Sequence, residues 1–189
     1  SVSDGMVERY QTVSSPLLMI SRQLQRSIIK QLKDQRKGGK MTGLLMGRKL
    51  DARALHRNDG KVFYKNNLPN DIPELAVGLL LDESGSMHSS NRATYARASA
   101  IILYDFCQSL DIPVMVYGHS TGHNDNVELY SYAEFDSIDN NDKYRMMDIG
   151  ARGCNRDGAA LRYVAERLSK RPETVKILIL VSDGQPNGR

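Results

Sequence analysis

The sequence predicts an α/β protein with a doubly wound, mostly parallel sheet, helices on both faces, and an N-terminal helical extension. Three runs of residues are almost entirely apolar, which is typical of central parallel strands covered on both faces. Amphipathic helical patterns alternate with these runs. A carboxylate follows two of the runs within two residues, at the edge where open α/β sheets bind ligands. The three runs span residues 75–81, 112–118 and 175–181.

The N-terminal part has a different pattern. Residues 15–37 have apolar side chains at spacings of three and four, which predicts an amphipathic helix. Residues 48–57 indicate a short helix, and residues 61–64 a short strand after a turn. A connector rich in proline and asparagine follows, so we expect a basic helical extension over residues 1–73 and the α/β domain over 74–189. The predicted helical stripe consists of Leu17, Ile20, Leu24, Ile28 and Leu32.

Within the α/β domain, the remaining elements follow from periodicity. A helix is predicted over 91–110 and another over 157–171, each with one apolar stripe. Residues 127–132 alternate between apolar and polar, which favours an edge strand. Residues 136–148 are polar and indicate a loop with a helical turn.

Composition favours a soluble globular protein. The chain has 189 residues, of which 40% are hydrophobic and 25% charged, and no apolar run approaches the roughly 20 residues of a membrane helix. Ser1–Tyr10 is too polar for a secretory signal. The two cysteines, Cys107 and Cys154, favour a reducing cytoplasm over a disulfide framework.

The positive charge is concentrated at the N-terminal end. Residues 1–75 carry 14 Lys and Arg against 7 Asp and Glu, whereas residues 76–189 carry 12 against 15. A basic arm of this kind can meet nucleic acid or an acidic protein surface, or form a solvated helix face. We favour the solvated face over nucleic acid because no aromatic residues interleave the charges. We expect the basic helix itself to dock on the domain or on an acidic partner.

Oxygen-bearing side chains follow two of the apolar runs. Asp82, Ser84 and Ser86 come directly after the first, and Asp183 comes after the last. Carboxylates and hydroxyls without nitrogen or sulfur ligands suit Mg²⁺, with Mn²⁺ or Ca²⁺ as alternatives. A turn before a predicted helix can complete the site through either Asn155 or Asp157. An open position on the cation would accept a carboxylate from a partner protein.

Two other interpretations of this stretch stay open. Asp82-x-Ser84-x-Ser86 can be a helix-capping turn, since Asp and Ser are common N-caps. A phosphotransfer or hydrolytic enzyme can use Asp82, but Ser84 stands where a second aspartate would be needed, and the sequence has no Gly-x-Ser-x-Gly elbow or phosphate loop. We therefore expect no catalysis by this chain, and we expect Glu83 to face solvent.

The motif resembles the metal-ion-dependent adhesion site of von Willebrand factor A (VWA) domains. The resemblance rests on Asp82-x-Ser84-x-Ser86 and on Ser182–Asp183–Gly184 after a buried strand. It implies that serines and a threonine contact the metal, and that aspartates act directly or through water. Asn155 stands where the family has threonine. A complete domain would continue beyond Arg189, so the resemblance also implies that the C-terminal part is missing.

A narrower resemblance covers residues 16–85. Arg22–Arg26 and Lys49–Ala52 are similar to the region before this domain in the cobaltochelatase CobT subunit and the nitric oxide reductase activation proteins. Membership would imply an accessory subunit of a MoxR-type AAA+ ATPase. Such a pair acts in metal insertion into, or activation of, a metalloenzyme.

Overall fold

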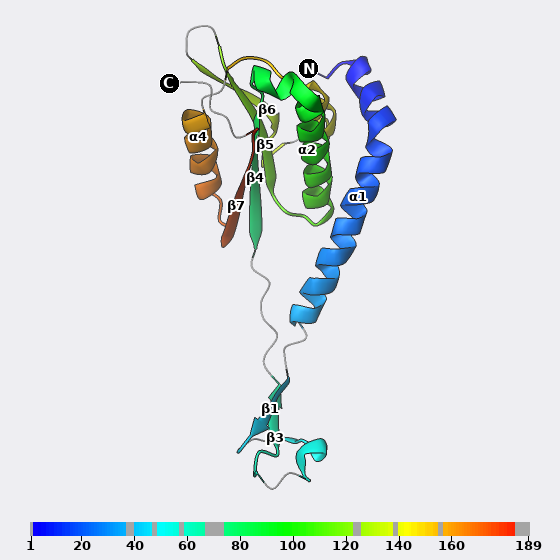
Figure 1. Cartoon of the computed structure of the whole chain (residues 1–189), viewed down its shortest axis with the longest axis vertical. Coiled ribbons are helices and arrows are strands. Elements are labelled where there is room, and N and C mark those ends of the chain that lie inside the picture. Colours follow the sequence, from blue (N-terminus) through cyan, green and yellow to red (C-terminus); the bar gives the residue numbers. More distant parts are fainter. Residues whose placement is uncertain are drawn as a thin grey trace. The chain divides into compact units, whose positions relative to one another are not determined.

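The computed structural model describes residues 2–36, 40–46, 49–56, 59–66, 74–122, 126–137, 140–154 and 157–183. The chain divides into two compact units. The first consists of Ser1–Gln25 and Pro73–Arg189, and the second of Arg26–Ile72. The fold is mixed α/β with two sheets, one of them partly parallel, which confirms the predicted α/β class at this level (Figure 1).

The first unit is built on a four-stranded sheet of order β6-β5-β4-β7. Strand β4 is parallel to β5 and to β7, whereas β6 runs antiparallel. Strand β6 lies at one edge, as its alternating sequence predicted. The strands are β4 (Leu75–Asp82), β5 (Val114–Thr121), β6 (Val127–Ala133) and β7 (Val175–Val181).

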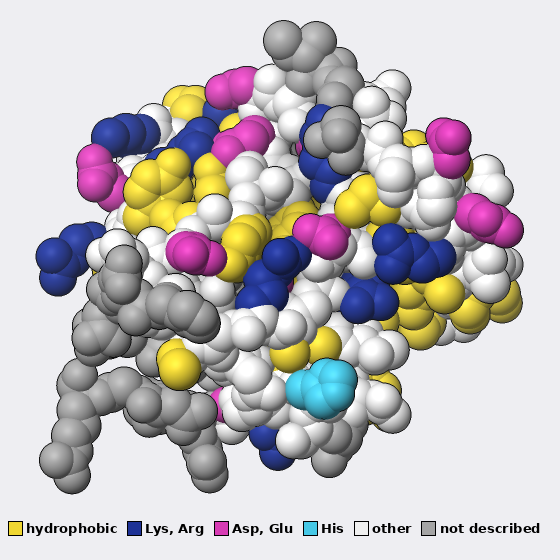
Figure 2. Space-filling model, turned by 90° about the horizontal axis from the view of Figure 1, so that it is seen from above, with side chains coloured by type: hydrophobic (Ala, Val, Ile, Leu, Met, Phe, Trp, Pro, Cys, Tyr) yellow, Lys and Arg dark blue, Asp and Glu magenta, His cyan; other side chains and the backbone are white. Residues whose placement is uncertain are grey.

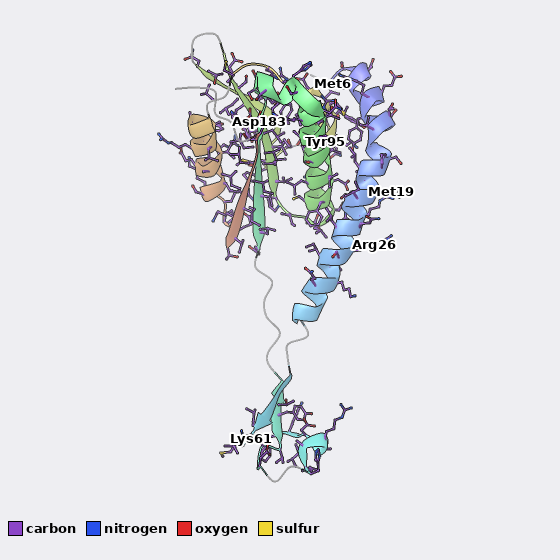
Figure 3. All side chains as sticks on the ribbon, in the orientation of Figure 1. Met6, Met19, Arg26, Lys61, Tyr95 and Asp183 are labelled. Atoms are coloured by element: carbon purple, nitrogen blue, oxygen red, sulfur yellow. The ribbon has the colours of Figure 1, made fainter. Side chains whose placement is uncertain are left out.

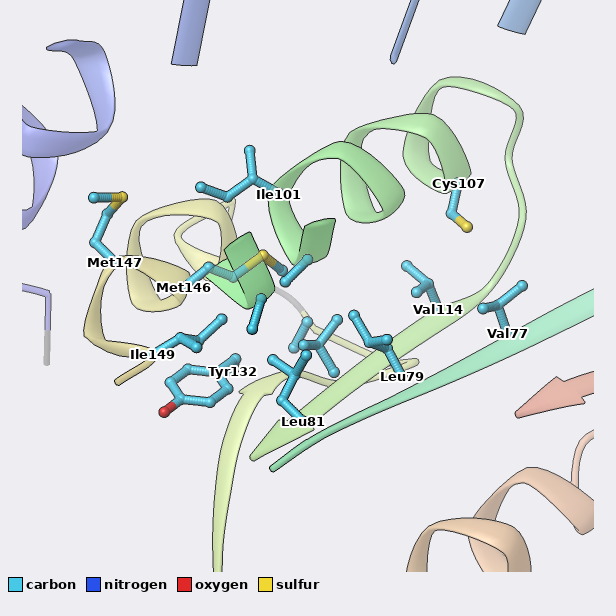
Figure 4. Packing of buried hydrophobic residues seen from close by; sticks show 14 of the residues in the cluster. Val77, Leu79, Leu81, Ile101, Cys107, Val114, Tyr132, Met146, Met147 and Ile149 are labelled. Atoms are coloured by element: carbon cyan, nitrogen blue, oxygen red, sulfur yellow. The ribbon is translucent and has the colours of Figure 1, made fainter. Parts of the chain in front are cut away.

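Helices lie on both faces of this sheet (Figure 1). Side chains of β4 point alternately toward the two faces, because successive residues of a strand point in opposite directions. Val77, Leu79 and Leu81 pack in one core with α2, and Ala76 and Leu80 pack in a second core with α4. Figure 4 shows the first core. The helices are α2 (Arg92–Ser109), α3 (Asp142–Arg145) and α4 (Asp157–Ser169), with 3₁₀ turns η2 (Gly85–Asn91) and η3 (Met146–Asp148).

Helix α1 (Asp4–Arg36) begins eleven residues before the predicted start and contains Pro16. Its buried side chains include Tyr10, whose ring meets that of Tyr144 edge to face at 5.3 Å. Ser21 Oγ donates to Asp105 Oδ2 at 2.6 Å. These contacts place the first part of α1 against the α/β core.

The predicted apolar stripe of α1 is partly wrong. Ile20 and Leu24 are exposed, whereas the small hydroxyl residues Ser14 and Ser21 are buried. The buried face therefore follows positions 10, 14, 17 and 21, spaced by three and four residues but shifted around the helix from the predicted stripe. Small side chains on this face allow close packing, which a hydrophobicity pattern does not detect.

Strand β7 also differs from expectation. Its bounds agree with the prediction, but Val175, Ile177 and Leu180 are exposed rather than buried. Among the described residues, β7 pairs only with β4 and forms an edge of the sheet. An edge position leaves one side of a strand uncovered, whatever its sequence.

The second unit contains a small antiparallel sheet of order β1-β3-β2. The helix predicted over 48–57 is wrong. A short strand and a 3₁₀ turn stand there instead, and Asp51 Oδ1 caps the turn by accepting from Arg53 N at 3.3 Å. The elements are β1 (Lys40–Leu44), β2 (Lys49–Leu50), η1 (Ala52–Ala54) and β3 (Phe63–Asn66).

Candidate functional site

The site is centred on Asp82, the last residue of β4. Its side chain is only 1% exposed, and both carboxylate oxygens accept hydrogen bonds. Oδ1 accepts from the backbone N–H of Ser84 at 2.8 Å, and Oδ2 accepts from Ser182 Oγ at 3.1 Å. The second bond follows from sheet register, because Leu81 pairs with Val181 and the next residues are neighbours.

Two more hydroxyls lie beside this carboxylate. Ser84 Oγ and Ser86 Oγ are 2.9 Å apart, and Ser84 is fully buried. Ser84 precedes η2, and its carbonyl accepts from Met87 N at 3.0 Å. Met87 is itself buried in the core, which anchors the turn. We call the side chains of Asp82, Ser84, Ser86, Ser182 and Asp183 the oxygen cluster.

Asp183 brings a second carboxylate to the same end of the sheet. It lies just beyond β7 (Figure 3), and only 3% of its side chain is exposed. Its Oδ2 accepts from Arg92 Nη1 at 2.9 Å. One carboxylate of the oxygen cluster is therefore already paired with a positive charge from the first residue of α2.

The segment before Asn155 also reaches this edge. Gly85 N donates to Gly153 O at 2.5 Å, and residues 121 and 154 exchange two backbone hydrogen bonds. Asn155 lies outside the described residues. Asp157 is the first residue of α4, and the position of its side chain is likewise outside the described part of the chain. Both stay predictions as completing ligands.

Glu83 is a buried residue that the sequence prediction placed wrongly, in solvent. It is 1% exposed rather than solvent-facing. Its carboxylate accepts from Tyr132 OH at 2.6 Å and Arg152 Nε at 2.7 Å. Burial raises the pKa of Glu83, against the opposing effect of the hydrogen bonds from Tyr132 and Arg152. Burial, together with the Glu83 charge, also raises the pKa of Tyr132.

This buried network clamps the 150–154 segment to the end of β4. Arg152 N donates to Glu83 O at 2.6 Å, and the guanidinium continues to Asp148 Oδ2 at 2.7 Å. Arg152 also stacks on Tyr130, with Cζ 4.2 Å from the ring centroid. Glu83 and Arg152 thus fix the backbone that lies against Ser84, without belonging to the oxygen cluster.

The surface around this end combines charged and apolar side chains. Figure 2 views the molecule from the side toward which β4 and β7 run, and Lys, Arg, Asp and Glu side chains are interspersed there with apolar ones. A cavity of about 460 Å³ opens beside the clamped segment. It is lined by Ser120, Thr121, Gly122, Asn126, Glu128, Tyr130, Arg152 and Gly153.

Comparison with known proteins gives limited matches. No family model matches the chain. Over 133 residues, 67% of the chain, it is 26% identical to the uncharacterized protein YojO of Bacillus subtilis (strain 168). The chain spans only 20% of the length of that relative. Among solved structures, the PilB minor pilin from Streptococcus sanguinis is similar at a TM-score of 0.47 and 18% identity, over 67% of this chain and 34% of that chain. A TM-score below 0.5 assigns neither fold nor function.

These findings contradict the predicted family. No family model matches, and neither similar protein is described as a VWA protein, a cobaltochelatase subunit or a nitric oxide reductase activation protein. Membership of the VWA family and of its CobT-like subfamily is therefore withdrawn. The assignment of the motif as that family's metal-ion-dependent adhesion site is withdrawn with it.

The described residues contain no group of three or more His, Cys, Asp and Glu side chains able to hold a metal ion. The expectation of a metal-binding protein therefore finds no such group in this part of the chain. The oxygen cluster is different, since it has two carboxylates and three hydroxyls. One observation is compatible with a cation at this cluster: Asp183 already binds a positively charged group, the Arg92 guanidinium. Among the described helices, none is long and apolar enough to cross a membrane.

Proposed function

We propose that the chain is a protein-binding module, and that its binding site is the oxygen cluster holding a divalent cation, preferably Mg²⁺. The observation that supports this is the meeting of two strand ends at one carboxylate. Asp82, from β4, is bonded to Ser182, which follows β7. Mg²⁺ is commonly held by one or two carboxylates and completed by water or partner oxygens, so hydroxyls and two aspartates suffice.

Each residue of the oxygen cluster has a defined part in this proposal. Asp82 organises the turn by accepting from Ser84 N, so its carboxylate fixes where the hydroxyls lie. Ser84 and Ser86 present adjacent hydroxyls, and Asp183 presents the second carboxylate. A bound Mg²⁺ would offer an open coordination position to a carboxylate of the partner protein.

The proposed partner is a protein with acidic groups. The second unit supports this choice, because Arg26–Ile72 carries 12 Lys and Arg against 4 Asp and Glu. Five large apolar residues are also exposed in the described part of this unit, and none is aromatic: Ile29, Leu45, Met46, Leu50 and Leu55. Proteins that bind single-stranded nucleic acid commonly stack bases on aromatic side chains, so a protein partner suits these exposed residues better than a nucleic acid does. An AAA+ ATPase and its metalloenzyme target were expected only from the resemblance to the CobT-like subfamily, which the comparisons contradict, so we propose the chemistry of the partner and no particular protein.

Two further proposals concern fold and location. We propose that the sheet of the first unit belongs to a doubly wound architecture, which is supported by helices on both faces of β4. We propose a reducing compartment such as the cytoplasm, which is supported by two free cysteines, Cys107 and Cys154.

Catalysis at Asp82 is not favoured as a second function. A phospho-acceptor or nucleophile needs an accessible oxygen, whereas this carboxylate is buried and both oxygens accept hydrogen bonds. We propose that the chain itself is not an enzyme.

The test is Mn²⁺ binding, followed by electron paramagnetic resonance of the free ion. The wild-type chain should bind one ion, and Ser86→Ala should weaken binding at least about fivefold by removing one ligand. Asp136→Asn removes an acidic group whose side chain is 91% exposed and should leave affinity unchanged. Absence of Mn²⁺ binding at millimolar concentration, or equal binding by Ser86→Ala, would refute the proposal.

A further inference from the structure

We infer that Arg92 is a built-in counter-ion that competes with the divalent cation for Asp183 and so sets the affinity of the oxygen cluster. This inference rests on the proposed cation-binding function. In the structure the Arg92 guanidinium is paired with the Asp183 carboxylate. Binding of a cation to Asp183 requires Arg92 to release this carboxylate. A bound cation and Arg92 would then exclude one another at the same oxygen.

The burial of the two partners indicates which of them moves. The Asp183 side chain is 3% exposed, whereas that of Arg92 is 46% exposed. A buried carboxylate is strongly stabilised by a nearby positive charge, because it has lost its hydration. The half-exposed guanidinium can instead regain water when it swings outward, so it is the partner able to leave.

The position of Arg92 in its helix supports a role in the site rather than in the helix. Arg92 is the first residue of α2. The positive end of a helix dipole disfavours a cation there, and an acidic residue would stabilise the helix better. Helix stability therefore does not explain an arginine at this position, whereas Asp183, 2.9 Å away, does.

The backbone before Arg92 aims its side chain. Asn91, the last residue of η2 and the N-cap of α2, has φ 59°, in the left-handed region. Asparagine tolerates this conformation better than most residues. The turn η2 also carries Ser86, so one short segment connects a hydroxyl of the oxygen cluster to Arg92. Ligand placement and counter-ion placement are thus coupled through seven residues of 3₁₀ turn.

The experiment compares Mn²⁺ affinity of the full chain with that of Arg92→Gln, again by paramagnetic resonance of free Mn²⁺. If the Arg92–Asp183 ion pair is open in about one molecule in ten, the Arg92→Gln substitution should raise the apparent affinity for Mn²⁺ about tenfold. Arg22→Gln is the matched control, since it removes the same charge from an exposed position on α1. Arg92→Lys keeps the charge and should bind Mn²⁺ with an affinity between those of wild type and Arg92→Gln.

A double variant ties the effect to the carboxylate. In an Asp183→Asn background, Arg92→Gln should no longer change Mn²⁺ affinity, because the competed oxygen is gone. Circular dichroism would show that each variant is folded.

The outcomes separate the two proposals. If wild type binds Mn²⁺ and Arg92→Gln binds it no more tightly than Arg22→Gln does, the counter-ion inference fails and the binding site stands. If wild type, Arg92→Gln and Ser86→Ala all fail to bind Mn²⁺, the proposed function fails as well. An equal gain in affinity for Arg22→Gln and Arg92→Gln would reduce the effect to net charge and would overturn the inference.

Discussion

Replacing Gly118 by alanine is a direct test of the buried network around Glu83. A Cβ atom at position 118 would overlap Glu83 Oε1, lie 2.7 Å from its Cδ, and lie 3.0 Å from Tyr132 Cε2. The backbone of Gly118 cannot retreat, because β5 is hydrogen-bonded between β4 and β6. The carboxylate must therefore move and give up its bonds to Tyr132 and Arg152.

The magnitude follows from those bonds. Each hydrogen bond to a charged group contributes about 1.5–3 kcal/mol, and overpacking adds about 1–3 kcal/mol. We expect Gly118→Ala to lower the free energy of unfolding by about 4 kcal/mol, measured by urea denaturation with an unchanged slope. In a Glu83→Ala background the same substitution should cost less than about 1 kcal/mol, since the clashing carboxylate is absent.

Gly78→Ala, on the neighbouring strand β4, provides the matched control. Its Cβ would meet the ends of two flexible side chains, Met115 Cε at 3.2 Å and Leu178 Cδ1 at 3.3 Å. These can shift by a few tenths of an ångström, so we expect a loss of about 1 kcal/mol. If Gly118→Ala proves no more destabilising than Gly78→Ala, or if Glu83→Ala does not rescue it, the buried position of Glu83 is wrong.

Three further predictions concern the same unit. Burial raises the pKa of Glu83, so the folded chain holds this proton more tightly than the unfolded chain does. We therefore expect the wild-type chain to be stabilised relative to Glu83→Gln at low pH and to lose this advantage as pH rises. The difference in unfolding free energy should be largest below the pKa of Glu83 in the unfolded chain and should fall as pH rises through its pKa in the folded chain. A difference that stays constant in urea titrations between about pH 4 and pH 8 would contradict this. Leu80→Ala removes a fully buried side chain between β4 and α4 and should lower the free energy of unfolding by about 2–5 kcal/mol in urea. Tyr10→Ala removes the edge-to-face contact with Tyr144 and should lower it by about 3 kcal/mol, with faster hydrogen exchange in α1 than in β4; equal acceleration in both would show that α1 is not a separately anchored element.

The central elements of the fold could be predicted because their sequence patterns are long and unmixed. Strands β4 and β7 begin where their apolar runs begin, and α2 and α4 follow 3.6-residue stripes. The hydrophobic pattern does not determine which strands lie next to each other in the sheet. An apolar run has the same sequence at the centre and at the edge of a sheet, so the exposure of β7 depends on topology.

The meeting of the two strand ends could be predicted, because chain direction alone decides it. Asp82 and Ser182 follow parallel strands in register, so they meet at one edge, as expected of parallel strands. Whether the oxygen cluster binds a cation stays a prediction. Arg92 was missed because its partner Asp183 is 91 residues away, and only the packing of α2 against the sheet brings the two together.

Glu83 shows where a signal existed in the sequence and was overlooked. A carboxylate placed directly after a buried strand suggests solvent, because the strand has ended and the next residues are polar. Gly118, however, interrupts the apolar run of β5, and a glycine inside a central strand often marks the close approach of another group. In the structure Gly118 pairs with Leu81, two residues before Glu83, and the space left by its missing side chain is filled by the Glu83 carboxylate. Glycine at position 118 and burial of Glu83 are therefore linked, because the glutamate carboxylate occupies the space where a side chain at 118 would lie. A glycine inside a parallel strand thus justifies searching the end of the adjacent strand for a buried polar group.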